Sequence, residues 1–126
     1  MILGIGIDII EVARIQAAHE RFGERLLRRI LLSNEIDYCL CRRAPGPFLA
    51  ARFAAKEAIS KAFGTGIGAQ LGWLDMEIGR RDSGEPFVTL HGAGQKLLQE
   101  RGARAVLISM SHTQVHAVAV ALLQGA

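Results

Sequence analysis

The sequence predicts an α+β fold in which a mainly antiparallel sheet packs against helices. Three observations support this class: the chain opens with a strand pattern, several helical segments follow up to residue 63, and the rest alternates like strands around one helix. Strands segregated from helices are typical of α+β proteins, whereas regular strand–helix alternation indicates a parallel sheet. At 126 residues, the chain is expected to form a single domain over residues 1–126.

Residues 2–10 predict the first strand, because the character of their side chains alternates along the backbone. One face carries isoleucines at positions 5, 7 and 9, and the other carries Gly4, Gly6 and Asp8. Two glycines leave bare backbone beside a lone carboxylate, which suits the close approach of another group. Asp8 also has a simpler interpretation, in which the strand ends there and the carboxylate caps the next helix.

A helical period then begins, and Gly23 is expected to break it into two pieces. Its apolar stripe consists of Val12, Ile15, His19, Phe22 and Leu26. Next, Ser33 and Asn34 predict the N-cap of a short helix through Cys41. Residues 48–63 form the most regular helical segment, rich in alanine, and Gly64 follows as its C-cap. The glycine-rich residues 64–68 are therefore expected to form a loop.

The second half of the chain predicts strands with one inserted helix. Leu74, Met76 and Ile78 alternate, and residues 87–91 return as their hairpin partner after a turn at residues 82–84. Residues 93–101 predict a helix. Residues 105–111 and 116–123 predict a second hairpin around a turn at residues 113–114.

Composition narrows the classes of function. The chain is 50% hydrophobic and 21% charged, which excludes a disordered protein, and its net charge of +3 slightly favours acidic partners. Aromatic residues make up 6% and are not interleaved with the basic residues, so no nucleic-acid partner is expected. The apolar N-terminal run lacks a basic leader and ends at Asp8, far short of a membrane span. Cys39 and Cys41 fit no zinc or redox motif, and we expect a cytoplasmic protein.

The helix over residues 48–63 carries the first candidate site. Glu57 and Lys61 are four residues apart on one face, and an isolated pair of this kind is usually a surface ion pair. However, Arg52, Lys56 and Lys61 crowd a helix that is otherwise apolar or alanine. Such a helix is expected to be largely buried, and buried charges need partners. A phosphate and a metal ion would supply them.

Asp8 extends this interpretation to a metal site. One carboxylate from a strand and one from a helix, completed by water and phosphate oxygens, is a usual way to hold Mg²⁺. The loop Gly64–Gly68 is either a flexible helix end or a place where backbone N–H groups approach a phosphate.

Two other groups of polar residues have alternative interpretations. Ser109, Ser111 and His112 lie near a strand end, where they either satisfy turn backbone or face a ligand; no nucleophile elbow supports a hydrolase. An arginine stripe follows the helical segment after residue 12, at Arg14, Arg21, Arg25 and Arg28. It is either a solvated face or a docking surface for an acidic protein.

Three motifs resemble one known family. GIGID at 4–8, RFAAKEAISKAFGTGIG at 52–68 and SMSHT at 109–113 are similar to the holo-[acyl-carrier-protein] synthases, small bacterial 4′-phosphopantetheinyl transferases. The resemblance covers nearly the whole chain, and the central block is the most specific. It implies the 4′-phosphopantetheinyl transferase fold and a homotrimer with active sites between subunits. It also implies two substrates, coenzyme A and an acyl carrier protein, with Mg²⁺ as the cofactor.

The resemblance assigns roles to residues of this chain. Asp8 and Glu57 would bind Mg²⁺, and Lys61 would contact the coenzyme A phosphates; these three would form the catalytic centre. Other coenzyme A contacts are implied for Arg42, Arg43, Arg52, Gly64, Thr65, Gly66, Gly68 and His112. The carrier protein would dock at Arg14, Arg21 and Arg25. The resemblance is looser over residues 14–47. The roles of the docking residues and of Arg42 and Arg43 therefore rest on fewer matching residues.

The implied reaction is attack by a carrier serine on the β-phosphate of coenzyme A, which releases adenosine 3′,5′-bisphosphate. The base is either Glu57 or a metal-bound water held by Asp8. Three competing classes use the same features. A metal-dependent phosphohydrolase would cleave coenzyme A without an acceptor, a nucleic-acid-binding module would use the arginines, and a structural trimer would have no reaction.

Overall fold

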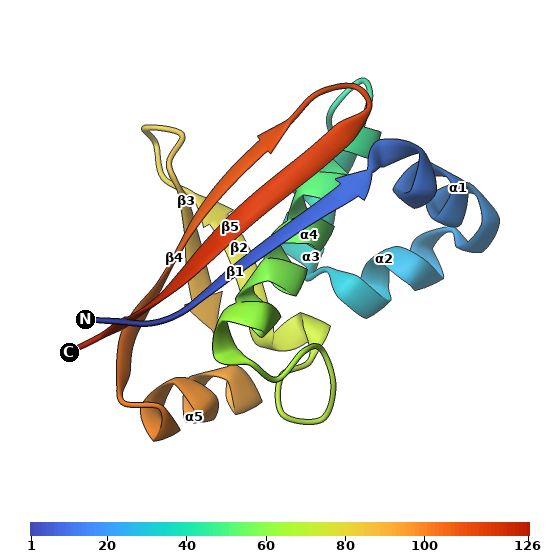
Figure 1. Cartoon of the computed structure of the whole chain (residues 1–126). Coiled ribbons are helices and arrows are strands. Elements are labelled where there is room, and N and C mark those ends of the chain that lie inside the picture. Colours follow the sequence, from blue (N-terminus) through green and yellow to red (C-terminus); the bar gives the residue numbers. More distant parts are fainter.

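The computed structural model describes all 126 residues, and it confirms the α+β class (Figure 1). The first half is β1 (Ile2–Glu11), α1 (Val12–Phe22), α2 (Glu24–Ile30), α3 (Ser33–Leu40) and α4 (Gly46–Phe63). A 3₁₀ turn, η1 (Trp73–Asp75), leads into the second half. That half is β2 (Met76–Arg80), β3 (Pro86–Leu90), α5 (Gly92–Glu100), β4 (Ala103–His112) and β5 (His116–Gly125).

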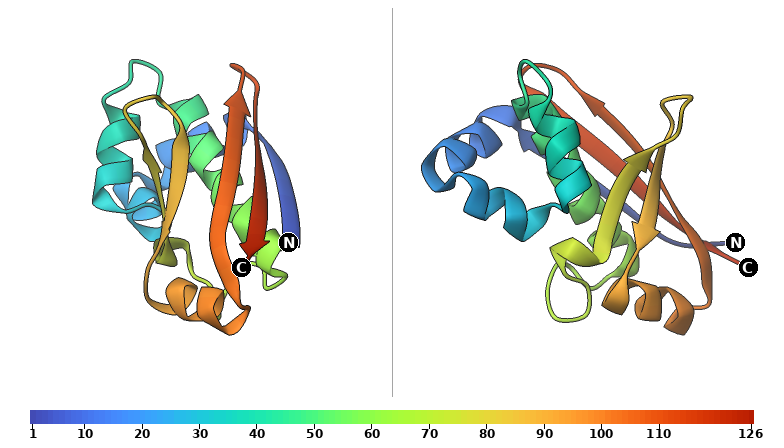
Figure 2. Two further views of the ribbon diagram at one scale, coloured as in Figure 1. Left: turned by 90° about the vertical axis from the view of Figure 1, so that its left-hand side faces the viewer. Right: turned by 180° about the vertical axis from the view of Figure 1, so that it is seen from behind.

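Both sheets are antiparallel, as predicted. The larger sheet has the order β1-β5-β4, and β2 and β3 form a separate hairpin. Helix α4 lies between them, with the three-stranded sheet on one side and α3 and the hairpin on the other (Figure 2). No helix has both the length and the apolar composition that crossing a membrane requires.

Glycines explain how closely α4 approaches the sheet. A Cβ added at Gly4 would lie 2.0 Å from the carbonyl oxygen of Ala62, and one at Gly6 would lie 2.0 Å from that of Ala58. The expected close approach at this face of β1 is therefore confirmed, and the approaching group is α4 itself. The isoleucines on the opposite face are left 66%, 60% and 66% exposed at positions 5, 7 and 9.

Gly23 separates α1 from α2, as expected, and its φ of 62° explains why a glycine ends the first helix there. The predicted apolar stripe holds only in part, because this break changes the direction of the chain. Val12 and Ile15 are buried, whereas Phe22 is 55% exposed at the end of α1.

Two local predictions were wrong. Ser33 and Asn34 do not cap α3; instead, Glu35 accepts a hydrogen bond of 2.8 Å from the backbone N–H of Leu32. Leu74 does not belong to a strand, because η1 precedes β2 and leaves this side chain exposed.

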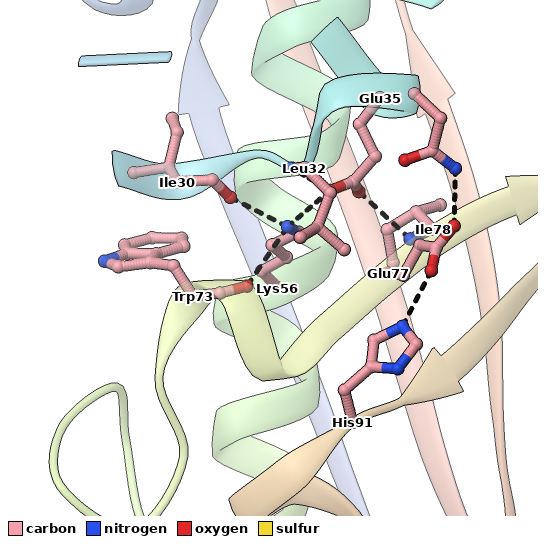
Figure 3. Close-up of polar contacts among 9 residues, drawn as sticks. Ile30, Leu32, Glu35, Lys56, Trp73, Glu77, Ile78 and His91 are labelled. Atoms are coloured by element: carbon pink, nitrogen blue, oxygen red, sulfur yellow. Dashed lines mark hydrogen bonds and ion pairs between the residues drawn. The ribbon is translucent and has the colours of Figure 1, made fainter. Parts of the chain in front are cut away.

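A buried ion pair fastens α3 to α4 (Figure 3). Lys56 Nζ donates to Glu35 Oε1 at 2.8 Å and to the carbonyl oxygens of Ile30 and Trp73 at 2.7 and 3.1 Å. Glu35 Oε2 also accepts the backbone N–H of Ile78 at 3.0 Å, which ties β2 to the same point. Burial lowers the pKa of Lys56, and the Glu35 carboxylate opposes this effect. The expectation that Lys56 needs an external phosphate or metal ion was therefore wrong.

Candidate functional site

Asp8, Glu57 and Lys61 come together at one surface hollow. The antiparallel run of β1 against α4 brings the strand aspartate level with the C-terminal half of the helix. The hollow has a volume of about 280 Å³ and is also lined by Ile9, Ile10, Arg14 and Phe53. Residues 49 positions apart in sequence thus share one site, which the spacing alone could not establish.

Lys61 forms its ion pair with Asp8 and not with Glu57. Lys61 Nζ donates to Asp8 Oδ1 at 3.1 Å and to the carbonyl oxygen of Ile7 at 2.9 Å. The strand continues to Glu11, so the interpretation of Asp8 as a helix cap was wrong. Asp8 is 17% exposed and Lys61 is 50% exposed, so the lysine can reorient while the aspartate stays fixed.

Glu57 has an environment that favours proton uptake. Partial burial and the neighbouring Asp8 carboxylate raise its pKa above 4.5, and Lys61 partly offsets this rise. The two carboxylates of the hollow face two basic side chains, Lys61 and Arg14. Glu57 can accept a proton from a group bound there.

The donor set suits Mg²⁺. Two carboxylates from different elements lie beside an open hollow, which leaves room for water or phosphate oxygens as further ligands. No group of three or more His, Cys, Asp or Glu side chains in the chain could hold a metal ion. A metal ion would therefore need further ligands besides two carboxylates. Asp8 and Glu57 are the residues that would hold it.

Arg42, Arg52 and His112 meet in a second cluster, through Tyr38 and Phe48. The guanidinium carbons of Arg42 and Arg52 lie 4.3 and 4.2 Å from the centroid of the Tyr38 ring. Phe48 packs edge-on against both Tyr38 and His112, with centroid distances of 6.2 and 4.9 Å. The sequence prediction missed both aromatic residues. Each stands four positions before an arginine, and that spacing is the signal that could have identified them.

Arg52 is the most unusual charge in the protein. It is 1% exposed, yet its Nε and Nη1 atoms have no hydrogen-bond partner and no carboxylate lies within ion-pair distance. Buried polar groups are almost always paired in native proteins. The guanidinium of Arg52 therefore keeps hydrogen-bond donors that no group of the chain uses. Arg43, from the loop before α4, is exposed and makes no ion pair.

The loop at residues 64–68 forms as predicted, with Gly64 as C-cap at φ 79°. Its backbone donors are already used, because the N–H groups of Gly64, Thr65 and Gly66 bond to the carbonyl oxygens of Lys61 and Ser60. The N–H of Gly68 bonds to Leu71 at 3.0 Å. In this conformation the four N–H groups are not free to receive a phosphate, and those of Gly64, Thr65 and Gly66 complete the end of α4.

Comparison with known proteins identifies the family. The family model of the 4′-phosphopantetheinyl transferase superfamily matches residues 4–121. A holo-[acyl-carrier-protein] synthase from Koribacter versatilis is 46% identical over 124 residues, which cover 98% of this chain and 99% of the relative. The chain belongs to the holo-[acyl-carrier-protein] synthase family.

Solved structures of holo-[acyl-carrier-protein] synthases share the fold. The crystal structure of the synthase from Neisseria meningitidis superimposes with a TM-score of 0.91 at 36% identity, covering 98% of this chain and 99% of the other. The synthase from Helicobacter pylori, in complex with coenzyme A, has a TM-score of 0.85 at 34% identity. That comparison covers 95% of this chain and 99% of the other.

The predicted docking arginines of this family member lie on α1 and α2, and one of them borders the first hollow. Arg14 lines it directly, and Arg21 stacks over the ring of Phe22 at 5.1 Å from α1. Arg25, from α2, lines a different hollow with Phe22 and Arg29. All three predicted docking arginines are exposed.

Proposed function

We propose that this chain acts as a holo-[acyl-carrier-protein] synthase whose reacting centre is the hollow formed by Asp8, Glu57 and Lys61. It transfers the 4′-phosphopantetheine group of coenzyme A to a serine of an acyl carrier protein. The observation that carries the assignment of the site is the convergence of these three side chains from β1 and α4.

In the proposed reaction, the serine oxygen forms a bond to the β-phosphorus of coenzyme A. The bond from that phosphorus to the bridging oxygen breaks, and adenosine 3′,5′-bisphosphate leaves with the electron pair. Glu57 accepts the serine proton, and its raised pKa supports this role. Lys61 swings from Asp8 to the diphosphate and offsets its developing negative charge.

Asp8 and Glu57 would hold Mg²⁺ between the hollow and the diphosphate. When bound, a divalent cation neutralises charge on phosphate oxygens and orients the leaving group. The chain itself contributes two carboxylates that repel each other, and Lys61 only partly compensates them. A bound cation relieves this repulsion.

Coenzyme A also needs cations away from the reacting centre. Arg42, Arg43, Arg52 and His112 are the proposed partners of its other phosphates, and the unpaired Nε and Nη1 of Arg52 support this assignment. The loop Gly64–Gly68 remains a proposed boundary of the site through its shape.

The outer face of the three-stranded sheet supports a homotrimer. Ile5, Leu122 and Leu107 form one row across the sheet, and Ile7 pairs with Val120 in the next. The isoleucines at 5, 7 and 9 and Leu107 are at least half exposed in the single chain. A contiguous apolar face of this kind usually marks a protein interface. We propose that three copies associate through it and share their active sites.

Arg14, Arg21 and Arg25 are proposed to bind the acidic surface of the carrier protein. Arg14 lines the hollow, so a carrier docked at this helix would present its serine there. Replacing Arg21 by glutamate is expected to raise the KM for the carrier about tenfold at low salt with little change in kcat. Added salt should reduce the difference, because it screens exposed charges. A KM unchanged by the substitution would contradict docking at this helix.

We expect the protein to act in the cytoplasm. Cys39 and Cys41 are both free thiols, as a reducing compartment maintains them. Burial raises the pKa of the Cys39 thiol to about 11 and Arg52 partly counters this rise, so the buried thiol is unreactive.

Intact-mass spectrometry of an apo carrier protein tests the function. Incubation with this protein, coenzyme A and Mg²⁺ should add one 4′-phosphopantetheine group to the carrier. A matched reaction with a carrier whose acceptor serine is alanine should add nothing. Coenzyme A cleavage without a carrier would instead favour the phosphohydrolase, and an unmodified carrier in the complete reaction would contradict the transferase.

A further inference from the structure

Tyr38 holds two cations against one ring. The guanidinium carbons of Arg42 and Arg52 lie 4.3 and 4.2 Å from its centroid, so they are separated by at most the sum of these distances, about 8.5 Å. Arg42 comes from the exposed segment after α3, whereas Arg52 is buried on α4. Tyr38 is therefore the point where two arginines ten residues apart in sequence lie together.

No carboxylate compensates this pair. Neither arginine forms an ion pair, and Nε and Nη1 of Arg52 have no partner at all. Two like charges at this distance repel each other, most strongly where one is buried. The arrangement is therefore more favourable when an anion with more than one negative charge lies between or beside them.

The ring itself is held in place from two sides. Glu35, three residues earlier on α3, is anchored by Lys56 and by the backbone of β2 (Figure 3). Phe48 packs edge-on against Tyr38 at 6.2 Å, and Arg42 also lies 5.0 Å from the centroid of Phe48. A fixed ring restricts the orientation of both guanidinium groups.

Stacking has a chemical consequence that an ion pair would not have. A cation–π contact involves the flat face of a guanidinium and leaves its N–H donors, which lie in the plane, available to an anion. A carboxylate partner would occupy those donors. The contact with Tyr38 therefore orients Arg42 and Arg52 while keeping their hydrogen-bonding capacity for a ligand.

We propose that Tyr38 is a positioning residue that pre-orients Arg42 and Arg52 for the phosphates of coenzyme A. This inference depends on the proposed function and adds to it a residue outside the family motifs. The ring makes no contact with the reacting hollow, so it acts on substrate affinity and not on the chemical step.

Steady-state kinetics with an apo carrier protein tests the proposal. Tyr38→Leu, which removes the ring but keeps an apolar side chain, should raise the KM for coenzyme A about tenfold and leave kcat within about twofold. Tyr38→Phe keeps the ring and should restore the KM to within about twofold. A Tyr38→Leu variant with the wild-type KM overturns the proposal, and so does a loss confined to kcat.

A second variant covers the case in which Tyr38→Leu does not fold. Arg42→Lys lies at an exposed position and keeps the charge, but lysine has no flat face to stack on the ring. It should raise the KM for coenzyme A about as much as Tyr38→Leu, and a wild-type KM would overturn the proposal. If the wild-type protein fails to modify any carrier, the proposed function is wrong. If the wild-type protein modifies the carrier and the variants have the same KM for coenzyme A, only the role of Tyr38 is wrong.

Discussion

Lys56 and Arg52 lie one turn apart on α4, and both are buried, yet their surroundings are opposite. Lys56 is fully satisfied within the chain, by Glu35 and by two carbonyl oxygens. Arg52 stacks on Tyr38 and leaves two of its nitrogens without a partner. The same helix thus carries one cation that completes the fold and one that leaves hydrogen-bonding capacity unused.

This difference shows how to read charges on a buried helix. A charge whose partners are all internal stabilises the arrangement of elements, because removing either partner leaves the other buried and unpaired. A charge without internal partners costs stability, and we propose that such a charge serves a ligand. Glu57, on another part of α4, belongs to the second kind, since the neighbouring Asp8 carboxylate raises its pKa. Lys61 does have partners within the chain, Asp8 and the carbonyl oxygen of Ile7, but it is half exposed.

The largest effect on activity is expected from replacing Glu57, a carboxylate of the hollow. Glu57→Gln should lower kcat by about 10²–10⁴-fold, because it removes the proposed base and one of the two proposed metal ligands. The free energy of unfolding should stay the same or rise, since the repulsion from Asp8 is lost. Glu11→Gln, an exposed carboxylate at the end of the same β1 strand, is the control and should keep full activity. Substantial activity in Glu57→Gln would contradict the assignment of the hollow.

The satisfied charge should show the reverse pattern. Lys56→Ala is expected to lower the free energy of unfolding by about 3–5 kcal/mol, because Glu35 would remain buried without its counter-ion. Lys61→Ala, the same substitution five residues later at an exposed position, should lower it by less than about 1 kcal/mol. Chemical denaturation measures both. Equal losses in the two variants would show that the internal partners of Lys56 contribute no special stability.

A smaller effect on stability is expected at Glu77, which is partly exposed and has partners within the chain. Glu77 accepts hydrogen bonds from His91 at 2.7 Å and from the side chain of Asn34, and these contacts lower its pKa below 4.5 (Figure 3). A lowered carboxyl pKa contributes stability above pH 4.5 that is lost as the pH falls through the folded-state pKa. Thermal unfolding of wild type and Glu77→Gln should therefore differ above pH 4.5 and converge in more acidic solution.

Glu20→Gln, an exposed carboxylate on α1, serves as the control for this pH profile. Its melting temperature should track the wild type at every pH. A Glu77→Gln curve that stays parallel to the wild type down to pH 2 would show that the contacts with His91 and Asn34 do not depend on the ionised carboxylate.

The sequence predicted the fold well where the signal was local. Alternation defined β1, alanine content and Gly64 defined α4, and the polar turns placed both hairpins. The prediction failed at Phe22, because the break at Gly23 redirects the chain, and at Leu74, because η1 intervenes before β2. Both failures depend on the path of the backbone, which side-chain periodicity does not encode.

The prediction of the candidate site also succeeded for some residues and failed for others. The family resemblance selected Asp8, Glu57 and Lys61, and the fold brings these residues together. Lys56 seemed equally in need of an external partner, because Glu35 is 21 residues earlier and nothing in the sequence connects the two. Tyr38 was missed for a similar reason, since its contact with Arg52 arises only when α3 packs on α4.

Titration calorimetry of coenzyme A into wild type and Arg52→Met, together with the unfolding free energy of each, tests the central distinction most directly. Arg52→Met should unfold within about 1 kcal/mol of the wild type, because no internal hydrogen bond or ion pair is lost. It should bind coenzyme A about 10- to 100-fold more weakly, as expected when charge-assisted hydrogen bonds to a ligand are removed. An Arg52→Met protein that binds coenzyme A like the wild type but unfolds several kcal/mol more easily would make Arg52 a structural charge like Lys56, and would contradict this account.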